Sequence, residues 1–167
     1  MRILQLISIF AGGGIGSVTR DLCVALSEAG DEVTAVVNQG TALTQRLRAV
    51  PAVHLIERQG RAYTWILFLA GVIRRQRIQI VQAHHGRDYW PAIVAAKLSG
   101  VSPVVVLGRY LMQLPSATSQ KLLLRVCHVA AVSQAVQRQL DGVLRGPRKN
   151  LPVVSPGIDP PLFQPER

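Results

Sequence analysis

Two adjacent histidines and a nearby arginine, His84, His85 and Arg87, are the residues of this chain best suited to chemistry. They follow an apolar segment, 78–83, that is typical of a buried strand. Imidazole titrates near neutrality, so a histidine at a strand end can deprotonate a hydroxyl nucleophile. Adjacent side chains on an extended segment point to opposite sides, so one of the pair should reach the site. We expect His84 to be catalytic, with His85 and Arg87 as candidate substrate contacts; the alternative is a structural histidine.

A glycine-rich turn that contains Gly13, Gly14 and Gly16 follows the first apolar segment, 3–10. Such a turn lets the backbone approach a phosphate at the N-terminus of the next helix, where N–H groups and the helix dipole attract anions. The glycine spacing is not that of a dinucleotide fingerprint, and the second strand ends in Asn38 without an acid. The turn therefore indicates phosphate or sugar binding rather than NAD binding, unless it is only a tight turn.

Two further polar residues follow expected strands. Arg109 can bind a phosphate or carboxylate of a substrate, although a surface arginine can also be merely solvated. Ser133 is most simply the N-cap of the next helix, and a substrate contact is the alternative. The proline-rich stretch 155–165 is typical of a linker that leaves a sheet.

Strand-like and helix-like segments alternate along the whole chain. The expected strands are 3–10, 32–37, 53–56, 78–83, 103–107, 128–132 and 151–154, and the expected helices are 17–29, 43–50, 62–77, 89–98, 119–126 and 133–144. This alternation predicts right-handed crossovers and a mainly parallel sheet. The fold class is therefore α/β, a doubly wound, Rossmann-like sheet of about seven strands with helices on both faces. Such sheets bind ligands at the carboxyl ends of their strands.

The composition fits one globular domain of 167 residues, since 49% of them are hydrophobic and 17% are charged. The formal net charge is +10, but the cations are spread over several elements without a nucleic-acid-binding motif. We therefore expect an anionic membrane or a phosphorylated substrate as partner, and no nucleic acid. Cys23 and Cys127 have neither metal-ligand spacing nor a disulfide pattern, which predicts reduced thiols, a cytoplasmic protein and no metal.

The expected helix 62–77 is apolar around most of its circumference and ends in Arg74, Arg75 and Arg77. The longest apolar stretch of the chain lies in this helix and is shorter than the roughly 20 residues that cross a bilayer. One interpretation is a helix covered by neighbours on both sides. The other is a peripheral contact with an anionic bilayer, in which the arginines reach lipid phosphates.

Four stretches together resemble the N-terminal half of a group 1 glycosyltransferase of the GT-B fold, of the family-four type. The stretches are the glycine-rich turn running into SVTRDLCVALSEAGDEVTAVV, then IQIVQAHHGRDYWPAIVAAKLSGVSPVVV, HVAAVSQAVQRQL, and VVSPGIDPPLFQPER. They cover most of the chain in the order of the family. The last stretch corresponds to the linker between the two domains of these enzymes.

The resemblance implies transfer of a sugar from a nucleotide-sugar, the co-substrate, to an acceptor held mainly by this domain. Residues 1–154 would form that domain and 155–167 the start of the linker, while the donor-binding C-terminal domain is absent from the chain. Gly13, Gly14 and Gly16 would lie near the acceptor and the donor diphosphate, and His84 near the acceptor hydroxyl.

Three expectations about function follow from the resemblance and the basic surface. We expect a lipid-linked or phosphorylated acceptor, little transferase activity from this chain alone, and a position at the inner face of the cytoplasmic membrane. The alternatives are a non-catalytic binding module with a basic face and a dinucleotide-dependent oxidoreductase domain.

Overall fold

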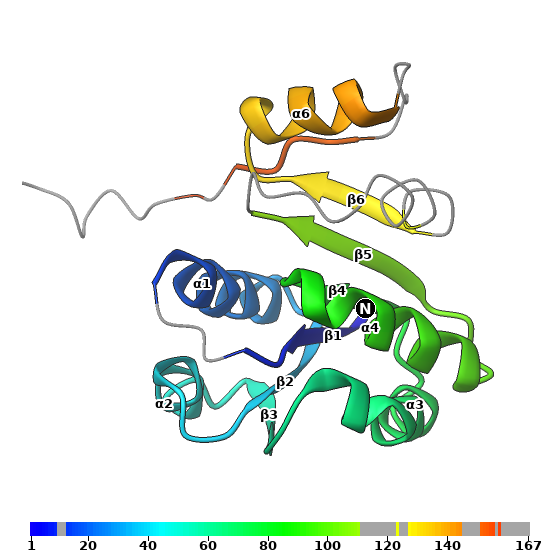
Figure 1. Ribbon diagram of the computed structural model, residues 1–167. Helices are drawn as coiled ribbons and strands as arrows, with labels where there is room; N and C mark the ends of the chain where they lie inside the picture. The colour runs from blue at the N-terminus through cyan, green and yellow to red at the C-terminus, as the bar shows by residue number, and fades with distance from the viewer. Residues whose placement is uncertain (10–12, 111–122, 124–126, 145–150, 156, 158–167) are drawn as a thin grey trace, which may run out of the picture.

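The computed structural model describes residues 1–9, 13–110, 123, 127–144, 151–155 and 157. They form a six-stranded sheet in the order β3-β2-β1-β4-β5-β6, in which neighbouring strands are parallel (Figure 1). The strands are β1 (Arg2–Ile7), β2 (Glu32–Asn38), β3 (Val53–Arg58), β4 (Ile80–Ala83), β5 (Val104–Arg109) and β6 (His128–Ala131). The expected doubly wound, Rossmann-like α/β fold is therefore confirmed.

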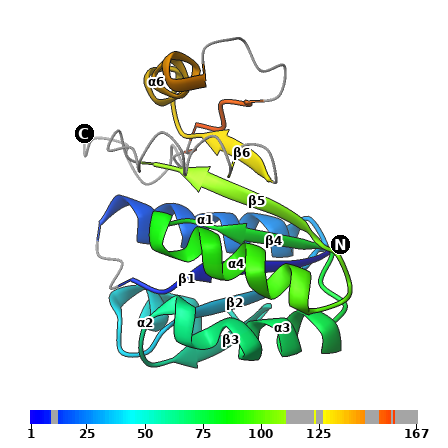
Figure 2. The same ribbon diagram turned by 45° about the vertical axis from the view of Figure 1, so that its right-hand side comes forward.

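Helices cover both faces of this sheet. They are α1 (Gly14–Glu28), α2 (Ala42–Arg48), the 3₁₀ turn η1 (Ala62–Trp65), α3 (Ile66–Arg75), α4 (Gly86–Leu98) and α6 (Gln134–Leu144). Helices α1 and α2 pack on one face, and η1, α3 and α4 pack side by side on the other (Figure 2). The central strand β1 is buried from both sides, which explains why its residues from Ile3 to Ile7 are apolar apart from Gln5.

Alternating side chains of the central strands fill two separate cores. Leu4 and Leu6 of β1 pack with Trp65 and Leu69 beneath η1 and α3. Ile7 belongs to the other core, beneath α1 and α2. Because side chains alternate across a strand, one apolar run can supply both layers.

The structure corrects two of the expected element boundaries. The expected seventh strand, 151–154, joins the sheet through one parallel bridge between Ala131 and Val153. Its ladder cannot extend through Pro152, which has no N–H to donate. The expected helix 62–77 starts as a 3₁₀ turn and ends at Arg75. The expected helix 119–126 lies outside the described residues except for Leu123, which is helical and buried.

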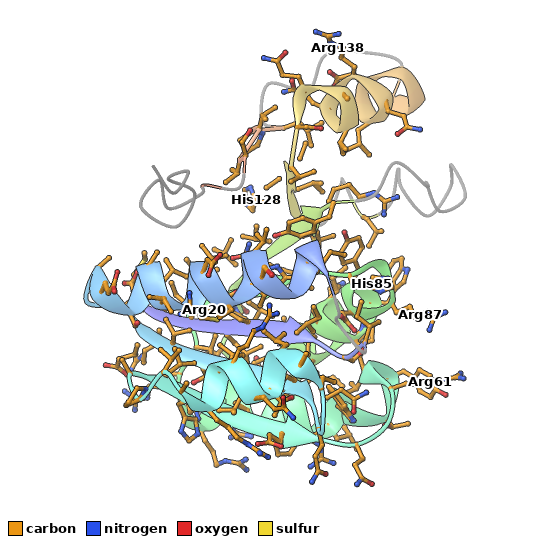
Figure 3. The ribbon with its side chains drawn as sticks, turned by 90° about the vertical axis from the view of Figure 1, so that its left-hand side faces the viewer. Arg20, Arg61, His85, Arg87, His128 and Arg138 are labelled. Atoms are coloured by element: carbon orange, nitrogen blue, oxygen red, sulfur yellow. The ribbon has the colours of Figure 1, made fainter. Side chains whose placement is uncertain are left out.

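The strand order reverses between β1 and β4. From β1 the chain winds outward through β2 and β3, and from β4 it winds the other way through β5 and β6. A doubly wound sheet opens a crevice at this reversal, outside the carboxyl ends of the two central strands. In Figure 3 this edge lies at the right, where His85, Arg87 and Arg61 are labelled. The turns after β1 and β4 are therefore the first place to look for a site.

Candidate functional site

The glycine-rich turn places the open N-terminus of α1 at this edge. Gly13 is the N-cap and has φ +82°, a left-handed conformation that glycine adopts without strain. A Cβ added at Gly13 or Gly14 would meet nothing within 4 Å, whereas Gly16 is buried within the helix. Glycine brings no capping side chain, and within the described residues the first N–H groups of α1 have no side-chain cap. This arrangement suits an anion.

A second helix N-terminus begins at the same edge, directly after β4. Helix α4 starts at Gly86, three residues before the expected position, and His85 is its N-cap. The Nδ1 atom of His85 accepts a hydrogen bond from the backbone N–H of Arg87 at 3.2 Å. The Arg87 side chain is exposed and extends from the edge (Figure 3).

His85 is half-buried, and its imidazole is held in the neutral form. Burial lowers the pKa of His85, and the positive charges of Arg87 and Arg109 lower it further. As the N-cap of α4, His85 is the histidine of the pair that lies at the carboxyl edge of the sheet. This role as a helix cap could have been read from the sequence, because a polar side chain precedes the first turn of α4.

The structure buries His84 inside the domain, and its catalytic role stays a prediction. Its side chain is 1% exposed. The His84 N–H donates to the carbonyl of Leu6 at 3.2 Å, which extends the pairing of β4 with β1 by one residue. The ring Nε2 lies 2.6 Å from Oε1 of Gln5, and Nδ1 lies 3.0 Å from the hydroxyl of Tyr110.

The partners of His84 determine where its proton lies. Gln5 donates through Nε2 to Gln82 at 3.2 Å, so its Oε1 faces His84 as an acceptor. Nε2 of His84 then carries the proton, and Nδ1 accepts from the hydroxyl of Tyr110. Burial lowers the pKa of His84 to about 4 and raises that of Tyr110 to about 12, so both groups are neutral near pH 7. In this arrangement His84 has no surface for direct contact with an acceptor.

A buried carboxylate, Asp88, connects the turns around the crevice and was not predicted from the sequence. Asp88 is fully buried and accepts hydrogen bonds from the hydroxyl of Ser8 and, at 3.2 Å, from its backbone N–H. Asn38 donates to the carbonyl of Ser8 at 2.9 Å and to that of Gly60 at 3.2 Å. These bonds fix the ends of β1, β2 and β3 against the first turn of α4.

Burial raises the pKa of Asp88 to about 6, although the two bonds from Ser8 lower it in part. An acidic residue in the first turn of a helix is favoured by the helix dipole. That signal was available in the sequence, but it is visible only when α4 is started at Gly86. Asp88 is thus a structural anchor at the edge of the candidate site.

Arg109 is the last residue of β5, and Ser133 lies just after the neighbouring strand β6. Arg109 ends β5 and is buried, so the alternative of a solvated surface arginine is wrong. A Cβ on Gly86 would lie 3.9 Å from Nη1 of Arg109, which brings this cation beneath the N-terminus of α4. The hydroxyl of Ser133 accepts from the N–H of Val136 at 3.3 Å, which confirms its expected capping of α6.

The structure therefore brings part of the predicted set together. Gly13 and Gly14 lie on the β1 side of the switch point. The other side, after β4 and β5, is formed by His85, Arg87 and Arg109. Ser133 is two strands away from β4 in the sheet order. Among the described residues there is no group of three or more His, Cys, Asp or Glu side chains that could hold a metal ion. Within the same residues, no helix is both long and apolar enough to cross a membrane.

The strand order, the two helical layers and the crevice at the reversal define a Rossmann-like α/β domain. The sequence profile of Glycosyltransferase Family 4 matches residues 12–161, and the chain belongs to this family. The resemblance to the N-terminal domain of group 1 GT-B glycosyltransferases is thereby confirmed. No curated protein sequence matches the chain.

Solved structures of glycosyltransferases share the fold. A glycosyltransferase from Rickettsia africae has a TM-score of 0.78 and 19% identity, over 98% of this chain and 46% of its own. Anabaena Alr3699/HepE, solved in complex with UDP, has a TM-score of 0.68 and 19% identity, over 98% and 46%. The lipopolysaccharide outer core galactosyltransferase WaaB has a TM-score of 0.70 and 14% identity, over 93% and 45%. The chain thus spans a little under half of the length of these proteins.

Proposed function

We propose that this chain is the acceptor-binding half of a glycosyltransferase that moves a sugar from a nucleotide-sugar to a lipid-linked or phosphorylated acceptor. The observation that carries the proposal is the pair of helix N-termini, at Gly14 of α1 and Gly86 of α4, that flank the switch point of a chain in Glycosyltransferase Family 4. Both carry the positive end of a helix dipole, and the N-terminus of α1 also presents backbone N–H groups without a capping side chain.

The charges at the switch point favour an anionic ligand. Arg87 is exposed at the edge and Arg109 lies beneath Gly86, while the one nearby carboxylate, Asp88, is buried and bonded to Ser8. A diphosphate or an acceptor phosphate would therefore meet the N–H donors of α1 and the positive charge of Arg87 and Arg109 beside α4. UDP in the related structure from Anabaena is a ligand of this chemical kind.

The two histidines take different parts in this proposal. His85 is neutral and stands at the edge, where it can contact an acceptor hydroxyl. His84 acts as a catalytic group only if the ring and Tyr110 rearrange, because both ring nitrogens are bonded inside the domain. Substitution of each histidine in the full-length enzyme separates the roles. Loss of a proton-transfer group lowers kcat by about 10²–10⁴.

The domain division and the location belong to the same proposal. Residues 1–154 form the acceptor side, residues 155–167 begin the linker, and a C-terminal domain outside this chain binds the donor. Without that domain, this chain has little or no transferase activity and needs no metal. The acceptor is held at the inner face of the cytoplasmic membrane, which agrees with the lipopolysaccharide substrate named for the related WaaB.

Two alternatives can be separated from this proposal. A dinucleotide-dependent oxidoreductase needs an acid at the end of β2, where Asn38 instead bonds the carbonyls of Ser8 and Gly60. A non-catalytic binding module would use the same basic edge but would have no sugar donor. The coding sequence downstream of Arg167 decides between the enzyme and the module.

The test is a titration of the ¹⁵N-labelled chain with inorganic pyrophosphate, followed by amide chemical shifts. We expect shifts at Gly13, Gly14, His85 and Arg87, and weaker binding after Arg87→Gln. The matched control is Arg138→Gln, an exposed cation on α6. Shifts spread over all basic segments, or equal weakening by both variants, would contradict the proposed site. Thermal protection by NADH instead of pyrophosphate would favour the oxidoreductase.

A further inference from the structure

The outer face of η1, α3 and α4 carries large apolar side chains in contact with water. Leu67 is 79% exposed, and Tyr63 and Leu98 are each 58% exposed. Trp90 and Val94 lie one turn apart on the exposed side of α4. The two helices pack side by side in the same layer (Figure 2), and these exposed side chains lie on the solvent side of that layer. We call this the α3–α4 face. A surface of this kind marks an interaction site.

Cations surround the apolar centre of the α3–α4 face. Both helices begin at the carboxyl edge of the sheet, where Arg61 and Arg87 extend into solvent on the same side of the molecule (Figure 3). At the opposite ends are Arg74, Arg75, Arg77 and Lys97, all exposed. The guanidinium of Arg75 folds back over Gly71, with Nη1 3.2 Å from where a Cβ would lie. This cation therefore lies one turn from Leu67 on the same helical stripe.

The same face has no exposed carboxylate. Between residues 58 and 110, all of which the structure describes, the one acidic residue is Asp88, and it is fully buried. The opposite layer differs, because α1 and its turn into β2 carry Asp21, Glu28, Asp31 and Glu32. Of the two helical layers that the structure describes, this one therefore combines exposed cations and exposed apolar side chains without an exposed carboxylate.

From these observations we infer that the α3–α4 face docks on an anionic lipid bilayer. Leu67, Tyr63 and Leu98 enter the headgroup region, and the surrounding arginines contact lipid phosphates, as in interfacial amphipathic helices. A bilayer fits this face better than a protein partner does. The cations at both ends of the helices can contact lipid phosphates while the apolar side chains between them enter the bilayer surface. The sequence pattern of α3 indicated only half of this surface, since the contribution of α4 depends on the packing of the two helices.

The position of this face also bears on the acceptor, a point that rests on the proposed function. Helix α4 begins at the candidate site with His85 and Arg87 and then runs along the docking face. A bilayer against α4 would hold lipid headgroups beside the switch point. An acceptor carried on a lipid could then reach the site without leaving the membrane.

The test is sedimentation of the chain with phosphatidylcholine vesicles, with and without phosphatidylglycerol. We expect binding only to the anionic vesicles. The pair Leu67→Gln and Leu98→Gln should weaken it by about ten-fold, since both side chains are mostly exposed and little packing is lost. The pair Arg74→Gln and Arg75→Gln should weaken it by roughly thirty-fold, at about five-fold for each cation.

The matched control removes two positive charges from the other layer, with Arg20→Gln and Arg46→Gln. This pair should leave binding close to that of the parent chain. Equal losses from both arginine pairs, binding unchanged by the leucine pair, or no binding to either vesicle would overturn the inference. So would dimers in solution that the leucine pair dissociates. Vesicle binding tests the α3–α4 face and the pyrophosphate titration tests the switch point. Either experiment can therefore fail while the other succeeds, so the two proposals are tested separately.

Discussion

Ser8 and Asp88 are 80 positions apart in the sequence, yet the carboxylate of Asp88 accepts hydrogen bonds from both the N–H and the hydroxyl of Ser8. The first residue after β1 is thereby fixed to the first turn of α4. Asn38 extends the connection to the end of β3 through the carbonyl of Gly60. The rigid side of the candidate site thus depends on one buried carboxylate.

We expect Asp88→Ala to lower the free energy of unfolding by about 1–3 kcal/mol, because the buried N–H and hydroxyl of Ser8 both lose their acceptor. Urea unfolding followed by circular dichroism measures the change. The control is Asp21→Ala, since the exposed pair of Asp21 with Arg20 should contribute less than about 1 kcal/mol. Equal effects of the two variants would show that the Asp88–Ser8 connection is not stabilising.

The pH dependence of stability should reveal two buried groups that oppose each other. Burial raises the pKa of Asp88 from 3.8 to about 6, so ionisation makes the folded state less stable as the pH rises through this range. Burial lowers the pKa of His84 from 6.5 to about 4, so its contribution to stability grows as the pH rises from about 4 to 6.5. The two slopes partly cancel in the parent chain.

Single substitutions should separate these slopes. In Asp88→Asn, the free energy of unfolding should rise more steeply with pH between about 4 and 6 than in the parent chain. In His84→Gln it should rise less steeply or fall. Urea unfolding at a series of pH values measures both. Three parallel curves would mean that neither group titrates as its burial requires.

The contact between Gly108 and the ring of Tyr110 leaves no room for a side chain. A Cβ on Gly108 would lie 2.8 Å from a ring carbon of Tyr110, whose hydroxyl bonds His84. We expect Gly108→Ala to displace the ring and to cost about 1–3 kcal/mol in unfolding free energy. Gly14→Ala is the control, because a Cβ there meets nothing within 4 Å. A thermal midpoint unchanged by Gly108→Ala would contradict this expectation.

Ser133 can be tested as a helix cap separately from any role in binding. Ser133→Ala should cost about 0.5–2 kcal/mol, since the N–H of Val136 loses its acceptor, and Ser133→Asp should restore most of the loss. Pyrophosphate affinity should stay the same in both variants. If Ser133→Ala weakens pyrophosphate binding and leaves the stability unchanged, the serine is a ligand contact rather than a stabilising cap.

The repeating pattern of the sequence predicted the sheet well, for a physical reason. Strands such as β1 and β2 are buried on both faces, so most of their residues are apolar and the segments stand out locally. The 151–154 segment has the same composition, but Pro152 prevents it from forming a ladder. The start of α4 was missed because Gly86 is a poor helix former, and the cap formed by His85 decides the boundary.

The site was harder to predict than the fold. Alternation correctly indicated that His84 and His85 point to opposite sides, but it does not say which side is the interior. That choice depends on Gln5 and Tyr110, which are far from His84 in the sequence and meet it only across the sheet. The Asp88–Ser8 connection has the same origin, because no local pattern joins residues 80 positions apart.

The strand order has a consequence for how the chain assembles during synthesis. The core beneath α1 and α2 uses residues from Ile7 to Val53, so it can close early. The core beneath α3 and α4 draws on residues from Leu4 to Leu151. One edge of β1 therefore stays unpaired until β4 has left the ribosome, because Ile3 pairs with Ile80. Such non-local parallel pairing is slow, and the open edge of β1 is the point at which a nascent chain would need protection from aggregation.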